Sequence, residues 1–168
     1  MSLTCEELKS HLAEVLVEWH AITCEQPWLS MPAEVRIDHL PELIRELSDA
    51  ALRTPVDLRS RLRALSAATA HGEDRRLHGF SDGLLFTEYY LLREALWRHI
   101  RQLWPLEDAG PAIMRIDLAL TLASRAALYG YHAPELRELG HDLPDLITDL
   151  LQQWPAERGA LTARPEPG

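Results

Sequence analysis

Six polar side chains fall on faces of predicted helices that are otherwise apolar, and their types could bind a ligand or take part in catalysis. Placing residues at 100° steps puts Glu88 and His99 among the leucines of one predicted helix, and Asp117 on the apolar stripe of the next. A charged side chain that points into a core needs a partner or a function. We therefore expect these residues to line one polar spot inside the protein: His71, Arg75, Glu88, His99, Asp117 and Ser124.

This polar spot allows two interpretations. In the first, the guanidinium of Arg75 pairs with Glu88 or Asp117 across a helix contact, and the pair fixes how the helices pack. In the second, the spot is a small-molecule pocket whose recognition groups are an arginine fork and an imidazole. The candidate ligand-binding residues of that pocket are His71, Arg75, Glu88, His99 and Asp117. Structural ion pairs are the commoner outcome, so the sequence favours the first interpretation and keeps the second as the alternative.

The sequence gives little support for a metal site, a haem site or a catalytic site. The one Glu-x-x-His spacing, from Glu138 to His141, spans Gly140, whereas a di-iron bundle needs two such copies on regular helices. Haem needs a single inward histidine, and His71 or His99 could supply it by spacing, although a core histidine is more commonly hydrogen-bonded. The chain carries no Walker, GxGxxG or HExxH pattern. We expect no catalytic residues, no metal, no cofactor and no enzyme activity.

Helical periodicity and capping signals recur along the whole chain, while alternating strand patterns bounded by turns do not. Thr4 with Glu7 forms a capping box, and Gly130 is expected to end the fifth helix. The predicted helices cover residues 4–24, 38–51, 54–79, 81–104, 111–129 and 134–154. The predicted fold is all α, a single-domain bundle of about six helices within residues 1–155, followed by a flexible C-terminal tail at 156–168.

Composition limits the partners and the compartment. The 168 residues suit one domain, and the net charge of −9, from 17 Lys and Arg against 26 Asp and Glu, argues against nucleic acid and anionic membranes. No apolar run reaches the ~20 residues of a membrane span, and Glu6 and Glu7 argue against a signal peptide. Cys5 and Cys24 lack CxxC spacing, so neither a disulfide framework nor a zinc knuckle is indicated. A cytoplasmic protein is expected.

The tryptophans follow helical faces or helix ends. This holds for Trp19, Trp97, Trp104 and Trp154, and nothing in their spacing indicates an aromatic cage. We expect them in the core or at a dimer interface.

Four segments in the centre of the chain carry a family resemblance: DHLPELIREL, AHGEDRRLHGFS, EYYLLREALW and RIDLALTLA. Together they resemble the N-terminal domain family of the RsbT co-antagonist protein RsbRD, a domain that also occurs ahead of histidine kinases. The similarity covers about residues 33–131. Its most specific pieces are His71-Gly72 with Arg75, then Gly79-Phe80, then Glu88-Tyr89 with Leu92-Arg93.

The resemblance implies an all-helical, non-catalytic sensory or regulatory domain, related to globin-like but haem-free input domains that are usually dimeric. It implies no particular ligand. Because no kinase or other output domain follows residue 131, we expect a stand-alone cytoplasmic signalling module that acts as a homodimer or through a signalling partner protein. The alternative is a small-molecule or haem-binding helical protein that uses the inward polar residues.

Overall fold

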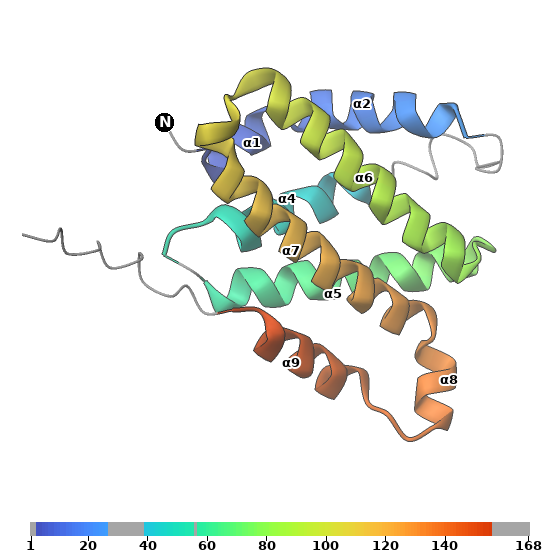
Figure 1. Ribbon diagram of the computed structural model, residues 1–168. Helices are drawn as coiled ribbons and strands as arrows, with labels where there is room; N and C mark the ends of the chain where they lie inside the picture. Colours follow the sequence, from blue (N-terminus) through green and yellow to red (C-terminus); the bar gives the residue numbers. More distant parts are fainter. Residues whose placement is uncertain (1–2, 27–38, 56, 156–168) are drawn as a thin grey trace, which may run out of the picture.

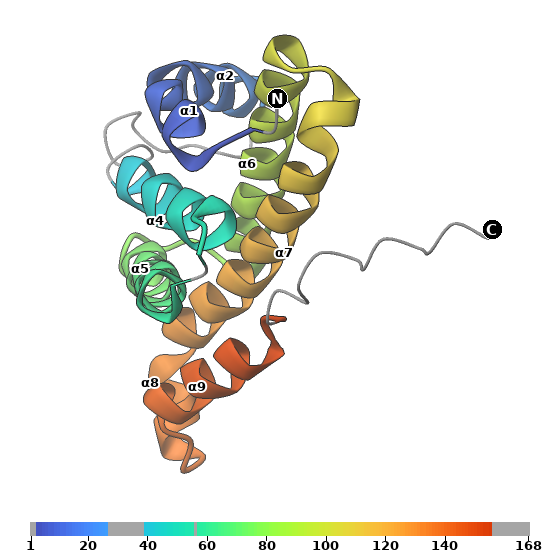
Figure 2. The ribbon, with the colours of Figure 1, turned by 90° about the vertical axis from the view of Figure 1, so that its left-hand side faces the viewer.

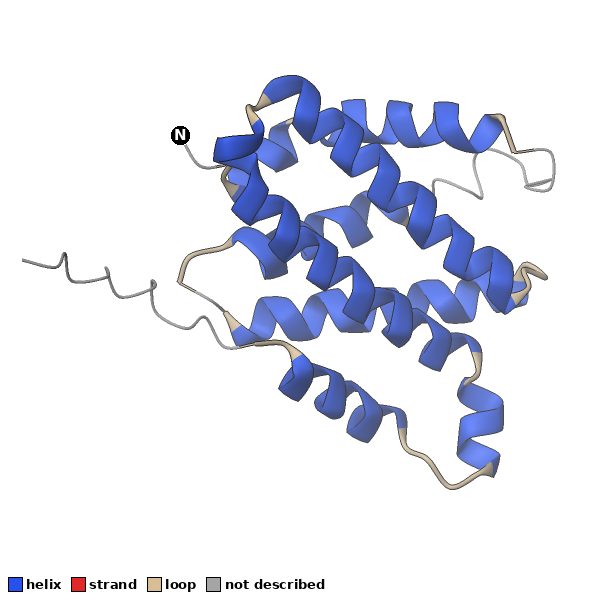
Figure 3. Cartoon of the chain, in the orientation of Figure 1, coloured by secondary structure: helices blue, strands red, loops and turns tan. Residues whose placement is uncertain are grey.

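The computed structural model describes residues 3–26, 39–55 and 57–155, and these form helices without strands (Figures 1 and 3). The helices are α1 (Cys5–Ser10), α2 (Leu12–Cys24), α4 (Leu40–Leu52), α5 (Leu58–Leu77), α6 (Asp82–Leu103), α7 (Leu106–Tyr131), α8 (Ala133–Glu138) and α9 (Leu143–Gln153). The prediction of an all-α fold is confirmed. The predicted tail at 156–168 lies outside the described residues, as do most of the connection after α2 and the expected cap at Asp38.

The described residues form more helices than the six predicted because two of the predicted helices are divided. The first is interrupted at His11, and the last between Glu138 and Leu143, around Gly140. Gly140 has a φ of +81° and Gly79 a φ of +78°, a left-handed conformation that favours glycine. These two glycines therefore end helices in the way the sequence predicts.

Hydrogen bonds at the helix starts follow the sequence signals in part. The predicted capping box is present, with Glu7 N donating to Thr4 Oγ1 over 3.3 Å and Thr4 N donating to Glu7 Oε2 over 2.8 Å. The predicted start of the third helix at residue 54 is wrong, because α5 begins at Leu58. There the carboxylate of Asp57 caps the helix by accepting from Arg59 N over 3.0 Å.

Two predictions about α7 are wrong. It begins at Leu106, and Pro111 lies inside it rather than at its start. Gly130 does not end the helix, because α7 continues to Tyr131. The reason for the glycine is packing: a Cβ atom at Gly130 would lie 2.0 Å from the carbonyl oxygen of Thr69 on α5.

Glycines on both helices let α5 and α7 cross at very short distance. A Cβ atom at Gly72 would lie 1.9 Å from the carbonyl oxygen of Ala127, so each helix presents a glycine to the backbone of the other. Around them Ala64 and Ala68 are fully buried. α5 thus has a face of small residues that suits close contact with α7.

The helices lie in two layers (Figures 1 and 2). The long helices α6 and α7 form one layer, and α1, α2, α4 and α5 form the other. α9 follows the lower edge of Figure 1 and contacts α5 and α7. The core fills the space between the layers, and its largest fully buried side chains include Trp19, Leu65, Leu85 and Leu120. Among the described residues, no helix has the length and apolar composition needed to cross a bilayer.

Candidate functional site

Three of the predicted site residues meet between α5 and α6. Arg75 donates to the Glu88 carboxylate from Nε, 3.0 Å from Oε2, and from Nη2, 2.9 Å from Oε1. His71 Nε2 lies 2.9 Å from Glu88 Oε2. The three side chains are 0–2% exposed. The structure thus confirms the first interpretation of the polar spot, in the version that pairs Arg75 with Glu88.

Local helix geometry positions this buried cluster of His71, Arg75 and Glu88. His71 and Arg75 are four residues apart on α5, so their side chains leave the same face one turn apart. The turn at Gly79 then brings α6 back, and Phe80 N donates to Arg75 O over 2.9 Å. The ring of Phe80 packs against the guanidinium, with Cζ of Arg75 at 5.3 Å from its centroid.

The charges of the cluster favour an ionised Glu88. Burial raises the pKa of this carboxyl, but the charges and hydrogen bonds of His71 and Arg75 outweigh burial and hold the pKa below its ordinary value. A second carboxylate takes part at the edge, because Arg75 Nη1 donates to Asp74 Oδ2 over 3.1 Å. The buried arginine is therefore shared by two carboxylates, one of them partly exposed.

Two buried polar atoms beside the cluster have no hydrogen-bond partner among the described residues: His71 Nδ1 and the hydroxyl of Tyr89. The rings of His71 and Tyr89 meet edge to face, with centroids 5.9 Å apart. Burial and the nearby Glu88 raise the pKa of Tyr89 well above its ordinary value, so its hydroxyl is neutral. A small cavity of about 100 Å³ lies beside His71, between α4 and α5. It is well below the ~300 Å³ at which small-molecule pockets begin.

Haem does not fit the residues present at this cluster. The Nε2 atom of His71 is engaged by Glu88, and the adjoining cavity of about 100 Å³ cannot hold a porphyrin. The geometry instead suits a structural ion pair that fixes the register of α5 against α6.

His99 and Asp117 do not join the cluster, so the expectation of one common polar spot is wrong for both. His99 lies eleven positions beyond Glu88 on α6, about 16 Å along the axis, where its ring is 5.3 Å from that of His11. Burial and the nearby His11 lower its pKa, so the ring is neutral at pH 7. Asp117 is 41% exposed and pairs with Arg93, with Oδ1 at 2.6 Å from Nε.

Ser124 is also separate from the cluster. Its hydroxyl donates to Thr121 O on its own helix over 2.9 Å. Ser124 is buried and lines the hollow between α6 and α7.

The outer side of α6 carries three exposed aromatic residues, of which the sequence singled out only Trp97, as a residue of the core or of a dimer interface. Phe86 and Tyr90 are each 56% exposed, and Trp97 is 39% exposed. At 100° per residue these three share one side of the helix with Arg93, Arg98 and Arg101. We call these six residues the α6 face. The spacing of residues 86, 90 and 97 does place them on one side of the helix. Because α6 has apolar residues on both sides, periodicity could not identify which side is exposed.

Two adjoining hollows follow the α6 face. One, of about 280 Å³, lies between α6 and α7, and the other, of about 350 Å³, lies along α6 toward its C-terminal end. Tyr90 and Arg93 line both of them, so the two hollows adjoin, and we call them together the groove. In Figures 1 and 2 this layer of the molecule faces outward, with α2, α4 and α5 on its other side.

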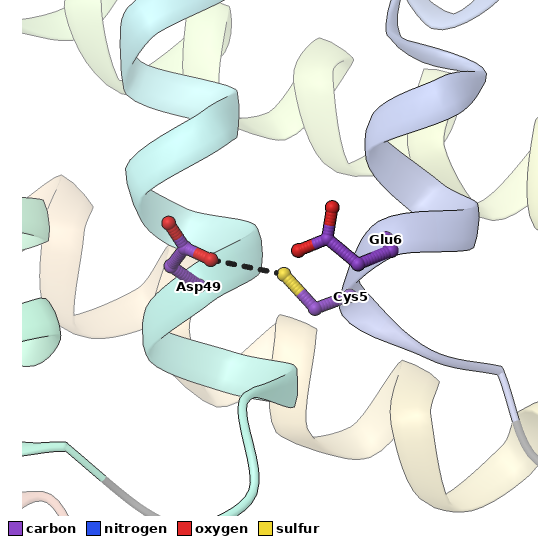
Figure 4. A group of neighbouring side chains, drawn as sticks. All are labelled: Cys5, Glu6 and Asp49. Atoms are coloured by element: carbon purple, nitrogen blue, oxygen red, sulfur yellow. Dashed lines mark hydrogen bonds between the residues drawn. The ribbon is translucent and has the colours of Figure 1, made fainter.

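A separate group of possible metal ligands joins α1 to α4 (Figure 4). The ligand atoms of Cys5, Glu6 and Asp49 lie within 4.8 Å of one another, and Cys5 Sγ donates to Asp49 Oδ1 over 3.1 Å. A cation already occupies the carboxylate, because Lys9 Nζ lies 2.6 Å from Asp49 Oδ1. Burial and Asp49 raise the pKa of the Cys5 thiol to about 11, whereas metals bind the thiolate. The group therefore acts as a junction between helices.

Cys5 is expected to react far more slowly than Cys24 with a thiol reagent such as dithionitrobenzoate. With a pKa of about 11, only about one Cys5 in a thousand is a thiolate at pH 8, and the side chain is buried, whereas Cys24 is exposed. Peptide mapping after timed labelling of the native protein measures both rates. Asp49→Asn should speed the labelling of Cys5, because a negative charge beside the sulfur is removed. Equal rates for the two cysteines would contradict the geometry of the junction.

Comparison of the chain with protein-family models, curated proteins and solved structures finds no match.

Proposed function

We propose that this chain is a non-catalytic, cytoplasmic signalling module that acts by binding another protein through the α6 face. The observation that carries the proposal is the exposure of three aromatic side chains on one side of α6, at 39–56% of their surface. Aromatic residues and arginine are the types most enriched at protein interfaces. A monomer gains nothing in stability from large rings placed in water.

The buried cluster supports a role in architecture rather than in chemistry. Glu88 is bound by two basic side chains, and the cavity beside it is too small for a typical substrate. The resemblance of the central segment to the RsbRD N-terminal domain family agrees with a regulatory role. It also supplies the expectation that the protein partner is either a second copy of the chain or a separate signalling protein.

Site-specific photo-cross-linking in the native host tests the proposal. A benzophenone amino acid in place of Tyr90 should give one discrete protein adduct, because this position lies in the middle of the groove. The matched control is Leu77, which is 85% exposed at the end of α5 and lies outside the α6 face. Adduct formation at position 77 equal to that at position 90 would contradict the proposal.

Trp97→Ala is expected to abolish or strongly weaken the adduct at position 90 while leaving the fold intact. Truncation of a central aromatic residue at an interface costs about 2 kcal/mol or more of binding, which is about thirtyfold in affinity. The exposed ring contributes less to folding, so Tm should fall by only a few degrees, a small change for a chain of this size. Cross-linking yield and thermal unfolding followed by circular dichroism measure the two effects. A folded variant that keeps the adduct would place Trp97 outside the interface, and one that unfolds would contradict the expectation that the ring contributes little to folding.

The alternative is a small-molecule binding protein, and the hollow of about 280 Å³ between α6 and α7 is the feature that favours it. Aromatic walls from Phe86 and Tyr90 and the hydroxyl groups of Thr121 and Ser124 line it. Native mass spectrometry of freshly purified protein tests this alternative. A mass excess that is lost on denaturation supports it, and the mass of the bare chain counts against a tightly held ligand.

A further inference from the structure

The groove along the α6 face is unusually basic for this protein. The chain as a whole carries 26 acidic and 17 basic residues, yet the groove is lined by four arginines and a single glutamate. The arginines are Arg93, Arg98, Arg101 and Arg125, and the glutamate is Glu94. A partner seated here meets a positive surface on a negative protein.

Two of the four arginines already have carboxylate partners. Arg93 pairs with Asp117, and Arg98 lies against Glu94 and Glu18. Carboxylates of the same chain largely compensate the charge of Arg93 and Arg98. These two residues therefore add to the groove mainly the surface of their aliphatic stems and planar guanidinium groups.

The other two arginines lie at opposite ends of the groove and have no carboxylate partner within the described ranges. Arg101 is exposed near the C-terminal end of α6. Arg125 on α7 contacts only the neutral amide oxygen of Gln153 and lies beside Phe86, near the start of α6. From Phe86 to Arg101 is fifteen residues of helix, or about 22 Å. Between these ends lie the exposed rings of Tyr90 and Trp97.

We infer that the groove binds an acidic amphipathic α-helix of a partner protein. This inference rests on the proposed function and specifies its partner. A helix of about 15 residues matches the 22 Å length, with an apolar stripe against the aromatic rings and a carboxylate toward each terminal arginine. Both ends then form ion pairs that the free protein lacks.

Charge argues against the other occupants of the groove. In a symmetric contact between two copies, parallel α6 helices would bring Arg101 against Arg101, and antiparallel helices would bring Arg101 toward the partner copy's Arg125 end. Either arrangement opposes like charges. A small ligand in one hollow meets only one of the terminal arginines, because Arg101 and Arg125 line different hollows.

Three stapled helical peptides of about 15 residues test the inference by fluorescence anisotropy with the full chain. They share one apolar stripe and differ only in polar residues, which are all Glu, all Gln or all Lys. The Glu peptide should bind about tenfold or more tightly than the Gln peptide, the Lys peptide should bind worst, and high salt should reduce these differences. Equal affinities, or no binding by the Glu peptide, would overturn the inference.

Charge reversal locates the interaction. Arg101→Glu combined with Arg125→Glu should remove the preference for the Glu peptide and transfer it to the Lys peptide. The matched control, Arg59→Glu combined with Arg137→Glu, makes the same charge change at exposed positions on α5 and α8 and should leave the affinities unchanged within about twofold. If the double variant does not fold, Arg101→Glu alone, at an exposed position, should weaken binding of the Glu peptide by about threefold or more.

The outcomes separate this inference from the function on which it rests. Absence of any preference for the Glu peptide in the wild-type chain, with continued adduct formation at position 90, would overturn the acidic helix and leave the proposed function standing. Binding of the Glu peptide without any adduct at position 90 in the host would overturn the proposed function. A dimer in analytical ultracentrifugation that Trp97→Ala dissolves would replace the acidic helix by a second copy of the chain.

Discussion

Gly72→Ala is expected to lower the free energy of unfolding by about 3 kcal/mol or more. The new Cβ atom would lie 1.9 Å from the carbonyl oxygen of Ala127 and 2.6 Å from its carbon, both of them backbone atoms. A flexible side chain could rotate away from the new methyl group, but backbone atoms cannot. α5 and α7 would therefore have to move apart, and their contact is the most extensive one between described helices. Gly130→Ala should have a similar effect, since its Cβ would lie 2.0 Å from the oxygen of Thr69.

Gly110→Ala provides the matched control. Gly110 lies on α7 with nothing within 4 Å of a Cβ atom, so the same substitution gains helix propensity and meets no clash. It should stabilise the protein by about 0.5–1 kcal/mol. Urea unfolding followed by circular dichroism gives all three values. Gly72→Ala with the stability of Gly110→Ala would mean that α5 and α7 do not cross as closely as the structure has them.

Arg75→Met is expected to cost about 3–5 kcal/mol of folding stability at pH 7. The substitution leaves the Glu88 carboxylate buried, with His71 as its remaining basic neighbour. Replacing both partners removes the uncompensated charge, so Arg75→Met combined with Glu88→Leu should recover most of the loss. Chemical unfolding of the single and double variants measures this recovery. A double variant less stable than Arg75→Met would show that the two side chains do not act as a pair.

The same cluster gives the protein an acid-sensitive component of stability. The pKa of Glu88 in the folded protein is lower than its ordinary value of 4.5, so its contribution is fully present above about pH 4.5 and is lost as pH falls through the lowered pKa. The difference in unfolding free energy between the wild type and Arg75→Met should therefore shrink below about pH 4.5. Urea titrations at pH 7 and in acid measure it, with Gly110→Ala as the variant whose difference stays constant. A difference independent of pH would contradict an ionised Glu88.

The buried ion pair was predictable because its information is local. His71 and Arg75 are one helical turn apart on a face of small residues, and a buried arginine requires a carboxylate. The choice between Glu88 and Asp117 was not predictable, since periodicity defines the face of a helix but not the neighbour that the face meets. α7 turns Asp117 outward to Arg93, and the length of α6 carries His99 about 16 Å away from Glu88.

The α6 face was hidden from sequence reasoning for a related reason. α6 has apolar residues around much of its circumference, and several of its leucines are fully buried while Phe86 and Tyr90 are exposed. Hydrophobicity alone does not distinguish an aromatic ring that packs in the core from one that is exposed on the surface. The same holds for Trp97, which the sequence placed either in the core or at an interface.

The sequence by itself determined the all-helical fold, the capping box at Thr4 and the requirement that Arg75 be paired, because these follow from interactions within one or two helical turns. Only the tertiary structure decided the role of Gly130, which resembles a helix stop but lets α7 approach Thr69. It also decided which aromatic residues face solvent. Both depend on how whole helices rotate and cross, and such long-range packing is set by the sum of many contacts that no local pattern records.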